Sequence, residues 1–151
     1  MKKTILLAGY DAAVRRMLSR VLVEEDYTVL ATSGEEAFER WEESQFDLVL
    51  LDLDAPAGDG WEIFQRLNTK YPSVPIVIIT AQPNQIFPAL ASGVGALMEK
   101  PLDLFKLLRM IEDLLKEPWA VRIARMEGRP SEFHYVPPKS KTPLYHLPVK
   151  F

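Results

Sequence analysis

Three residues of types that can act together on a phosphoryl group stand at the ends of short apolar stretches: Asp52, Thr80 and Lys100. A carboxylate can attack phosphorus and become an acyl phosphate. The transfer itself needs little covalent help, but it needs cations and donors that hold the phosphoryl oxygens. Lys100 supplies a cation and Thr80 a hydroxyl donor, so the three residue types suit phosphoryl transfer to Asp52.

The apolar stretches alternate with segments that have helical spacing of their apolar residues. We predict strands over residues 4–8, 27–32, 46–51, 75–80 and 96–98, and helices from residue 12 and over 33–43, 61–71, 84–92 and 103–116. Such alternation predicts an α/β fold with a parallel sheet and helices on both faces. Because ligands bind at the carboxyl ends of parallel strands, we expect Asp52, Thr80 and Lys100 to meet at that edge.

The composition limits the classes of protein to which the chain can belong. Its 151 residues include no cysteine, which excludes a disulfide scaffold, a cysteine nucleophile and a cysteine-ligated metal site. No apolar run approaches the length of about 20 residues that spans a membrane, and we expect a cytoplasmic protein. Glycine-rich nucleotide-binding loops are absent, so we expect no enzyme and no nucleotide cofactor.

The net charge of −3 hides two regions of opposite charge. Residues 118–151 carry six of the 18 basic residues, two of the 21 acidic ones and six of the 12 prolines, so this extension is basic and the body, 1–117, is acidic. Within the extension we predict a short helix over 119–126 and an edge strand over 133–136. The extension either packs on the body, with bases against acids, or recruits a partner. We favour packing because seven large apolar side chains are too many for a free linker.

The sequence resembles the receiver domains of response regulators in two-component signalling over about residues 4–117. The matching stretches are 5–7 with 14–18, 46–53, Pro56 with 59–62, 75–81 and 98–102. The resemblance implies a flavodoxin-like doubly wound sheet of five strands in the order 2-1-3-4-5. It also implies that Asp52 is the phosphoacceptor, Thr80 the switch hydroxyl and Lys100 the phosphate-binding lysine, followed by a cis Lys100–Pro101 bond.

The sequence departs from the family pattern at the same edge of the sheet. Receiver domains normally end the first strand with two acids that bind Mg²⁺ together with the phosphoacceptor, and here these positions are Gly9 and Tyr10. Asp52 is then the one Mg²⁺ ligand that the resemblance leaves. Asp54 is an additional acid that either lends charge to a cation or repels an incoming phosphate. Leu97 replaces an aromatic switch residue, and we therefore expect an atypical receiver.

Two functions follow from the resemblance. In the first, a stand-alone receiver in a phosphorelay accepts a phosphoryl group on Asp52 from a sensor histidine kinase or phosphotransfer protein, or signals to an unknown effector protein through its contacts. In the second, a pseudo-receiver binds its partner independently of phosphorylation. A pair between Lys100 and Asp52 fits both. A second copy of the chain is a further candidate partner, whereas the acidic balance and the short extension exclude nucleic acid, and no membrane partner is expected.

Overall fold

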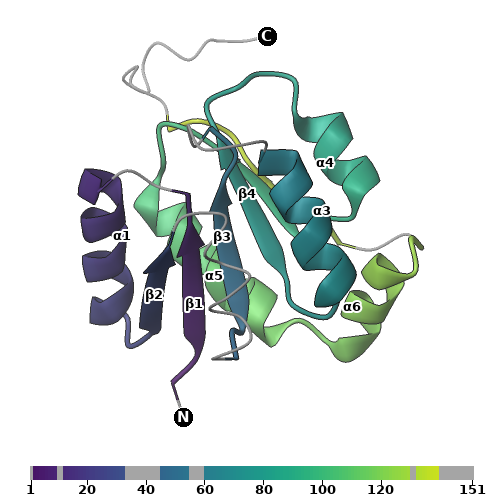
Figure 1. Cartoon of the computed structure of the whole chain (residues 1–151), viewed down its shortest axis with the longest axis horizontal. Helices are drawn as coiled ribbons and strands as arrows, with labels where there is room; N and C mark the ends of the chain where they lie inside the picture. The colour runs from purple at the N-terminus through teal and green to yellow at the C-terminus, as the bar shows by residue number, and fades with distance from the viewer. Residues whose placement is uncertain (1, 10–11, 33–44, 55–59, 130–131, 140–151) are drawn as a thin grey trace, which may run out of the picture.

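The central feature of the chain is a parallel sheet. The computed structural model describes residues 2–9, 12–32, 45–54, 60–129 and 132–139. In these residues six strands pair in the order β2-β1-β3-β4-β5-β6, and all neighbours are parallel (Figure 1). The strands are β1 (Thr4–Ala8), β2 (Thr28–Thr32), β3 (Leu48–Asp52), β4 (Ile76–Thr80), β5 (Ala96–Glu99) and β6 (His134–Val136).

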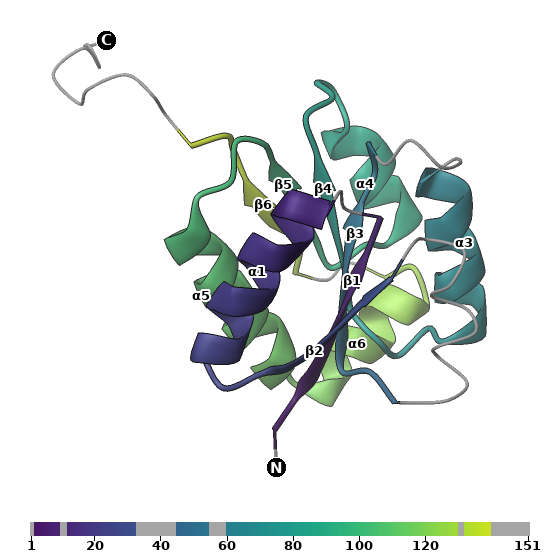
Figure 2. The same ribbon diagram turned by 60° about the vertical axis from the view of Figure 1, so that its left-hand side comes forward.

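Helices cover both faces of this sheet, as predicted (Figure 2). Helices α1 (Ala12–Glu24) and α5 (Leu104–Lys116) lie on one face, and α3 (Gly60–Lys70) and α4 (Ile86–Ser92) lie on the other. Two apolar clusters fill the layers, one built around Leu18, Leu22 and Leu107 and the other around Phe64 and Leu67. All five residues of β3 and of β4 are buried, because helices cover both faces of these central strands.

The sequence predicted this α/β fold, and its strand order 2-1-3-4-5 is confirmed. The observed elements begin or end within about two residues of the predicted ones, which is the usual scatter at element ends. The helix expected over 33–43 lies outside the described residues. Among the described helices, none combines the length and apolar character needed to cross a membrane.

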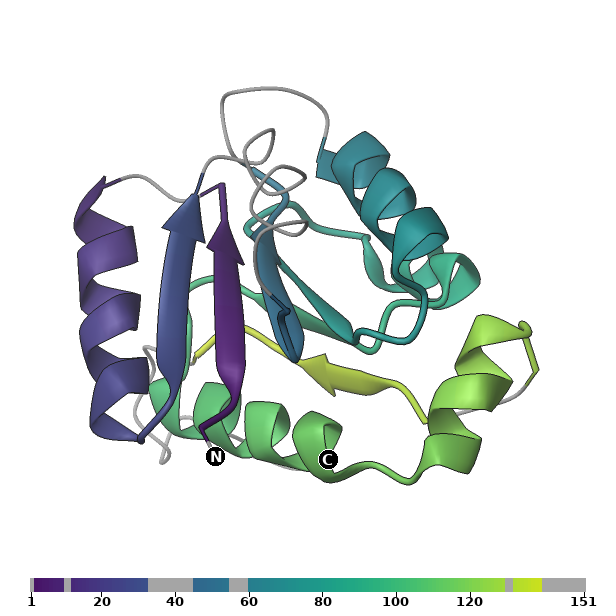
Figure 3. The same ribbon diagram turned by 60° about the horizontal axis from the view of Figure 1, so that its bottom comes forward.

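The helix and the edge strand predicted in the extension are both present, and the strand adds a sixth member to the predicted five-stranded sheet. After α5, the chain forms α6 (Trp119–Met126) and returns as β6 beside β5 (Figure 3). Polar contacts join this segment to the body: both Arg122 and Arg125 reach the Glu117 carboxylate, and the Tyr135 hydroxyl donates to Glu99. These contacts favour the packed interpretation of the extension over residues 118–129 and 132–139.

Gly60, the first residue of α3, lies against the backbone of Leu53, which joins Asp52 to Asp54. A Cβ on Gly60 would stand 2.9 Å from the Leu53 Cα and 2.7 Å from its Cδ1. Since one of these atoms is backbone, a change of side-chain rotamer cannot remove the clash. We expect Gly60→Ala to lower the free energy of unfolding by about 1–3 kcal/mol in urea denaturation.

Gly95→Ala is the matched control for that substitution. A Cβ on Gly95 would meet the Leu114 Cδ2 at 3.2 Å, which is the end of a flexible side chain that can move slightly. The expected loss of stability is therefore clearly smaller than for Gly60→Ala. Equal losses in the two variants would contradict the assignment of a rigid contact at Gly60.

Candidate functional site

The register of the sheet brings the three predicted site residues together. Asp52 pairs with Ile79 of β4, and Thr80 pairs with Glu99 of β5, so all three strands end at one level. Backbone hydrogen bonds continue one residue further, from the Leu53 N–H to the Ile79 carbonyl (2.8 Å) and from the Lys100 N–H to the Thr80 carbonyl (2.8 Å). The Lys100–Pro101 peptide bond is cis, as expected. The edge that holds the site is therefore fixed by the strands themselves.

Asp52 and Lys100 form an ion pair at this edge. The Lys100 Nζ lies 3.2 Å from the Asp52 Oδ1 and 3.0 Å from its Oδ2. The Asp52 side chain is 9% exposed and the Lys100 side chain 30%, so the pair stands at the rim of the core. The Asp54 backbone N–H also donates to the Asp52 Oδ1, at 2.8 Å. Asp52 is thus a nearly buried carboxylate whose charge Lys100 neutralises.

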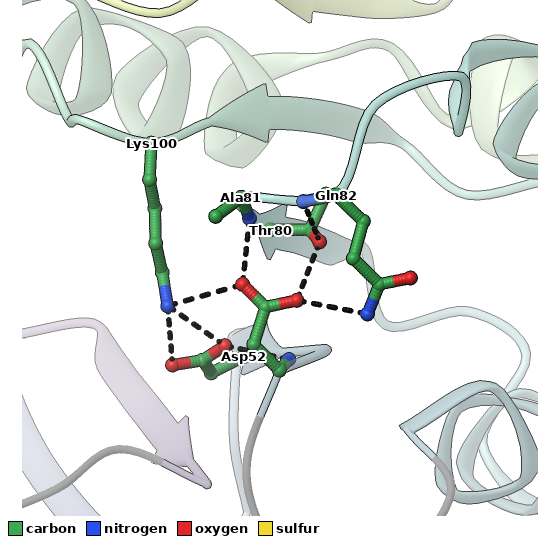
Figure 4. Close-up of polar contacts among 6 residues, drawn as sticks. Asp52, Thr80, Ala81, Gln82 and Lys100 are labelled. Carbon is green, nitrogen blue, oxygen red and sulfur yellow. Dashed lines mark hydrogen bonds and ion pairs between the residues drawn. The ribbon is translucent and has the colours of Figure 1, made fainter.

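The Asp54 carboxylate occupies the centre of the remaining donors. Its Oδ1 accepts from the Thr80 hydroxyl at 2.6 Å and from the Gln82 side-chain amide at 3.0 Å. Its Oδ2 accepts from the Ala81 backbone N–H at 2.6 Å and lies 3.3 Å from the Lys100 Nζ. Figure 4 shows Thr80, Ala81, Gln82 and Lys100 directed into one small space above Asp52.

These contacts move the pKa values of Asp54 and Lys100 in opposite directions. Burial would raise the pKa of Asp54, but the bonds from Thr80, Ala81 and Gln82 and the charge of Lys100 hold that pKa below its ordinary value of 3.8. For Lys100, burial would lower the pKa, whereas hydrogen bonding to Asp52 and the charges of Asp52 and Asp54 raise it above 10.5.

The directions of these shifts fix the pH range over which the network stabilises the fold. The contribution of a carboxyl with a lowered pKa is present above its unfolded value and is lost as pH falls through the folded one. The contribution of a lysine with a raised pKa is present below its unfolded value and is lost as pH rises through the folded one. The network therefore stabilises the fold fully above about pH 3.8 and below about pH 10.5.

The described residues at this edge do not fit a Mg²⁺ site. The space between the Asp52 and Asp54 carboxylates is taken by the Lys100 ammonium, which would repel a second cation. Gly9, at the end of β1, carries no ligand, and its φ of 97° is a conformation that side-chain-bearing residues rarely adopt. Among the described residues, no three acids, histidines or cysteines form a group that could hold a metal ion.

Several predicted residues lie elsewhere or outside the described part of the chain. Leu97, at the position of the aromatic switch residue, is fully buried in the cluster under α3 and α4. Tyr10 is not among the described residues. The donors Ala81 and Gln82 were not predicted, although their position directly after Thr80 is a signal that could have found them.

Comparison with known proteins identifies the family. The family model for the response regulator receiver domain, which describes sequences, matches residues 5–112 of this chain. The chain belongs to this family. As a receiver domain it is a signalling module of two-component systems, and the predicted family membership is confirmed.

Relatives of this receiver domain include longer regulators. It is 33% identical over 118 residues to the DNA-binding transcriptional regulator NtrC of Rhizobium meliloti, covering 76% of this chain and 24% of that protein. It is 29% identical over 119 residues to the response regulator GtcR of Aneurinibacillus migulanus, covering 77% and 49%. The chain therefore spans between about a quarter and a half of the length of these relatives.

Solved receiver domains have the same fold over the same part of the chain. A CheY-like response regulator receiver domain protein from Methanospirillum hungatei superposes with a TM-score of 0.70 at 25% identity, covering 76% of this chain and 94% of that one. A putative response regulator from Chloroflexus aurantiacus superposes with a TM-score of 0.69 at 27% identity, covering 78% and 100%.

Proposed function

We propose that this receiver domain accepts a phosphoryl group on Asp52 in a phosphorelay and passes the signal on through protein contacts. The observation that carries the proposal is the position of Lys100, whose Nζ lies 3.0 and 3.2 Å from the two oxygens of Asp52 at the carboxyl edge of the sheet. A cation so placed neutralises charge on a phosphoryl group attached to Asp52.

The donor in this proposal is the phosphohistidine of a sensor histidine kinase or a phosphotransfer protein. An Asp52 oxygen attacks phosphorus, the P–N bond breaks, and the electron pair stays on the imidazole nitrogen, which takes up a proton. Asp52 becomes an aspartyl phosphate. No step is assigned to a metal ion, since the described residues do not fit one.

The recipient in this proposal is an effector protein, and the contacts lie near α4 and β5. Helix α4 begins six residues after Thr80, and its Phe87 and Leu90 side chains are 81% and 52% exposed. Helix α4 follows the strand that ends in Thr80, and β5 leads directly into Lys100, so a change at either residue reaches these elements directly. The stand-alone arrangement, a cytoplasmic location and a second copy of the chain as partner stay predictions.

The proposal is tested by mass spectrometry of the intact chain after incubation with acetyl phosphate in buffer that contains MgCl₂. We expect one phosphoryl group to be added to the wild type and none to Asp52→Asn. Asp26→Asn is the matched control, because Asp26 is an exposed acid at the opposite end of the sheet. The backbone of Asp26 has a positive φ, which asparagine also tolerates. Equal labelling of wild type and Asp52→Asn would place the acceptor elsewhere.

A second candidate function is a phosphorylation-independent interaction module. Two observations favour it: Gly9 supplies no acid, and the donors expected to bind a phosphoryl group already hold Asp54. In that case the wild type stays unlabelled, and Asp52→Asn binds the effector protein as tightly as the wild type does.

A further inference from the structure

The donors around Asp54 are the groups that a phosphate would need. A phosphoryl group carries a charge of about −1.5 to −2 and three acceptor oxygens. At this edge of the sheet, the Thr80 hydroxyl, the Ala81 N–H and the Lys100 ammonium converge on one space, with the Gln82 amide beside them. Their contacts in the structure go to the two oxygens of Asp54.

Proton counting shows that these donors are fully engaged. The Thr80 hydroxyl has one proton, which it donates to Asp54. Its oxygen accepts from the backbone N–H of Gln82 at 2.9 Å. The Ala81 amide also has one proton, and it is donated to Asp54. The Lys100 ammonium has three protons and contacts three carboxylate oxygens, two of Asp52 and one of Asp54. A phosphoryl group could therefore bind these three groups only if Asp54 left them.

Charge leads to the same conclusion. The Asp54 pKa lies below its ordinary value because its neighbours are donors and a cation, so the carboxylate is ionised at neutral pH. A phosphoryl group on Asp52 would add negative charge next to this carboxylate, and Lys100, which already pairs with Asp52 and Asp54, would have to balance both. Departure of Asp54 into solvent is feasible, because its side chain is already 22% exposed.

We propose that Asp54 is an internal ligand of the phosphate-binding groups. Its carboxylate takes the contacts with Thr80, Ala81 and Lys100 that free phosphate, or a phosphoryl group on Asp52, would otherwise make. Asp54 therefore competes with phosphate at this site, and it keeps the Thr80 hydroxyl bound to an anion when no phosphate is present. Only the consequence for phosphorylation rests on the proposed function of Asp52.

The experiment uses the full ¹⁵N-labelled chain and inorganic phosphate as the probe. Removal of the internal carboxylate in Asp54→Ala should open the site, so that phosphate shifts the Ala81 and Gln82 amide signals in a saturable manner. We expect an apparent affinity at least about tenfold higher than that of the wild type, equivalent to about 1.4 kcal/mol. Asp54→Asn gives the same test with a side chain of unchanged shape.

Asp26→Asn controls for the loss of one negative charge, because Asp26 is 81% exposed at the opposite end of the sheet. This variant should bind phosphate as weakly as the wild type does. In Asp54→Ala, phosphate should also return the Ala81 amide signal toward its wild-type position. The proposal is overturned if neither Asp54 variant binds phosphate more tightly than Asp26→Asn does.

Two further arms separate free phosphate from a phosphoryl group on Asp52. Phosphate binding to Asp54→Ala that persists in Asp52→Asn/Asp54→Ala is binding of the free anion. With acetyl phosphate, the internal-ligand proposal and the proposed function together predict faster labelling of Asp54→Ala than of the wild type. If Asp54→Ala binds phosphate more tightly than the wild type but is not labelled, the internal ligand is supported and the acceptor role is contradicted. If Asp54→Ala is labelled as fast as the wild type and binds phosphate no more tightly, the acceptor role is supported and the internal ligand is contradicted.

Discussion

Lys100→Met is expected to lower the free energy of unfolding by about 2–4 kcal/mol at neutral pH, measured by urea denaturation. Methionine keeps most of the side-chain length but removes the charge. The variant leaves Asp52, with a side chain 9% exposed, beside the Asp54 carboxylate without the shared cation. The loss is expected to shrink as pH falls through the lowered pKa of Asp54, because the protonated Asp54 carboxyl no longer needs a counter-charge.

Lys116→Met is the matched control. Lys116 forms an ion pair with Glu112 one helical turn away, and the two side chains are 74% and 60% exposed. Exposed pairs of this kind contribute only about 0.3–0.5 kcal/mol, so this variant should be close to the wild type.

A second substitution tests the cause of the loss in Lys100→Met. Adding Asp52→Asn removes the buried charge and should recover a substantial part of the lost stability. If Lys100→Met and Lys116→Met were equally stable, Lys100 would not be the counter-charge of the buried carboxylate.

Glu117→Ala is expected to have a similarly large effect, a loss of about 3–5 kcal/mol, because it removes the carboxylate from a nearly buried ionic cluster. The Glu117 side chain is 2% exposed and receives two parallel hydrogen bonds from Arg125, at 2.8 and 2.7 Å. The Arg122 Nε lies 3.4 Å from the same carboxylate. Without Glu117, the guanidinium of Arg125, which is 9% exposed, loses its counter-charge.

Glu127→Ala removes the same group from a solvated position and serves as the control. Glu127 pairs with Arg129, and the two side chains are 57% and 59% exposed, so we expect a change of less than about 1 kcal/mol. Hydrogen exchange adds a local measurement. In Glu117→Ala the His134 amide, which donates to the Gly95 carbonyl at 3.1 Å, should exchange faster than in Glu127→Ala. Unchanged exchange would mean that the cluster does not hold β6.

The fold could be predicted from the sequence because its pattern is strongly periodic. The runs that became β3 and β4 are almost entirely apolar, as strands covered on both faces must be. Once these strands are parallel, topology alone puts the end of each at one edge, which is why Asp52, Thr80 and Lys100 meet. The helix cap of α5 was equally local: Asp103 accepts from the Lys106 N–H at 3.2 Å.

The position of the Asp54 carboxylate could not be predicted in the same way. Asp54 follows the end of β3, where the backbone dihedral angles are no longer set by strand pairing, and spacing alone does not show where its side chain turns. The sequence left open whether the acid lends charge to a cation or repels a phosphate. The structure shows that the Asp54 carboxylate lies against a cation, Lys100, and accepts hydrogen bonds from Thr80 and Ala81 among its donors.

Glu117 was not singled out for a related reason. In the sequence it is one acid among several charged residues at the end of a helix, where an exposed side chain is the ordinary expectation. It becomes buried only because α6 turns back and brings Arg122 and Arg125 against it. This long-range packing is not encoded in any local spacing of residues.

The short strand β6 has a consequence for how the molecule meets other chains. An edge strand exposes unpaired backbone N–H and C=O groups, which are a template for strand addition and for aggregation. Residues 134–136 pair with Ala96, Leu97 and Met98, so this side of β5 is already occupied by the protein's own backbone. A peptide that joined the sheet here would meet three residues of β6 in place of the buried β5. Strand addition on this side therefore has only the three-residue edge of β6 to pair with, instead of the four residues of β5.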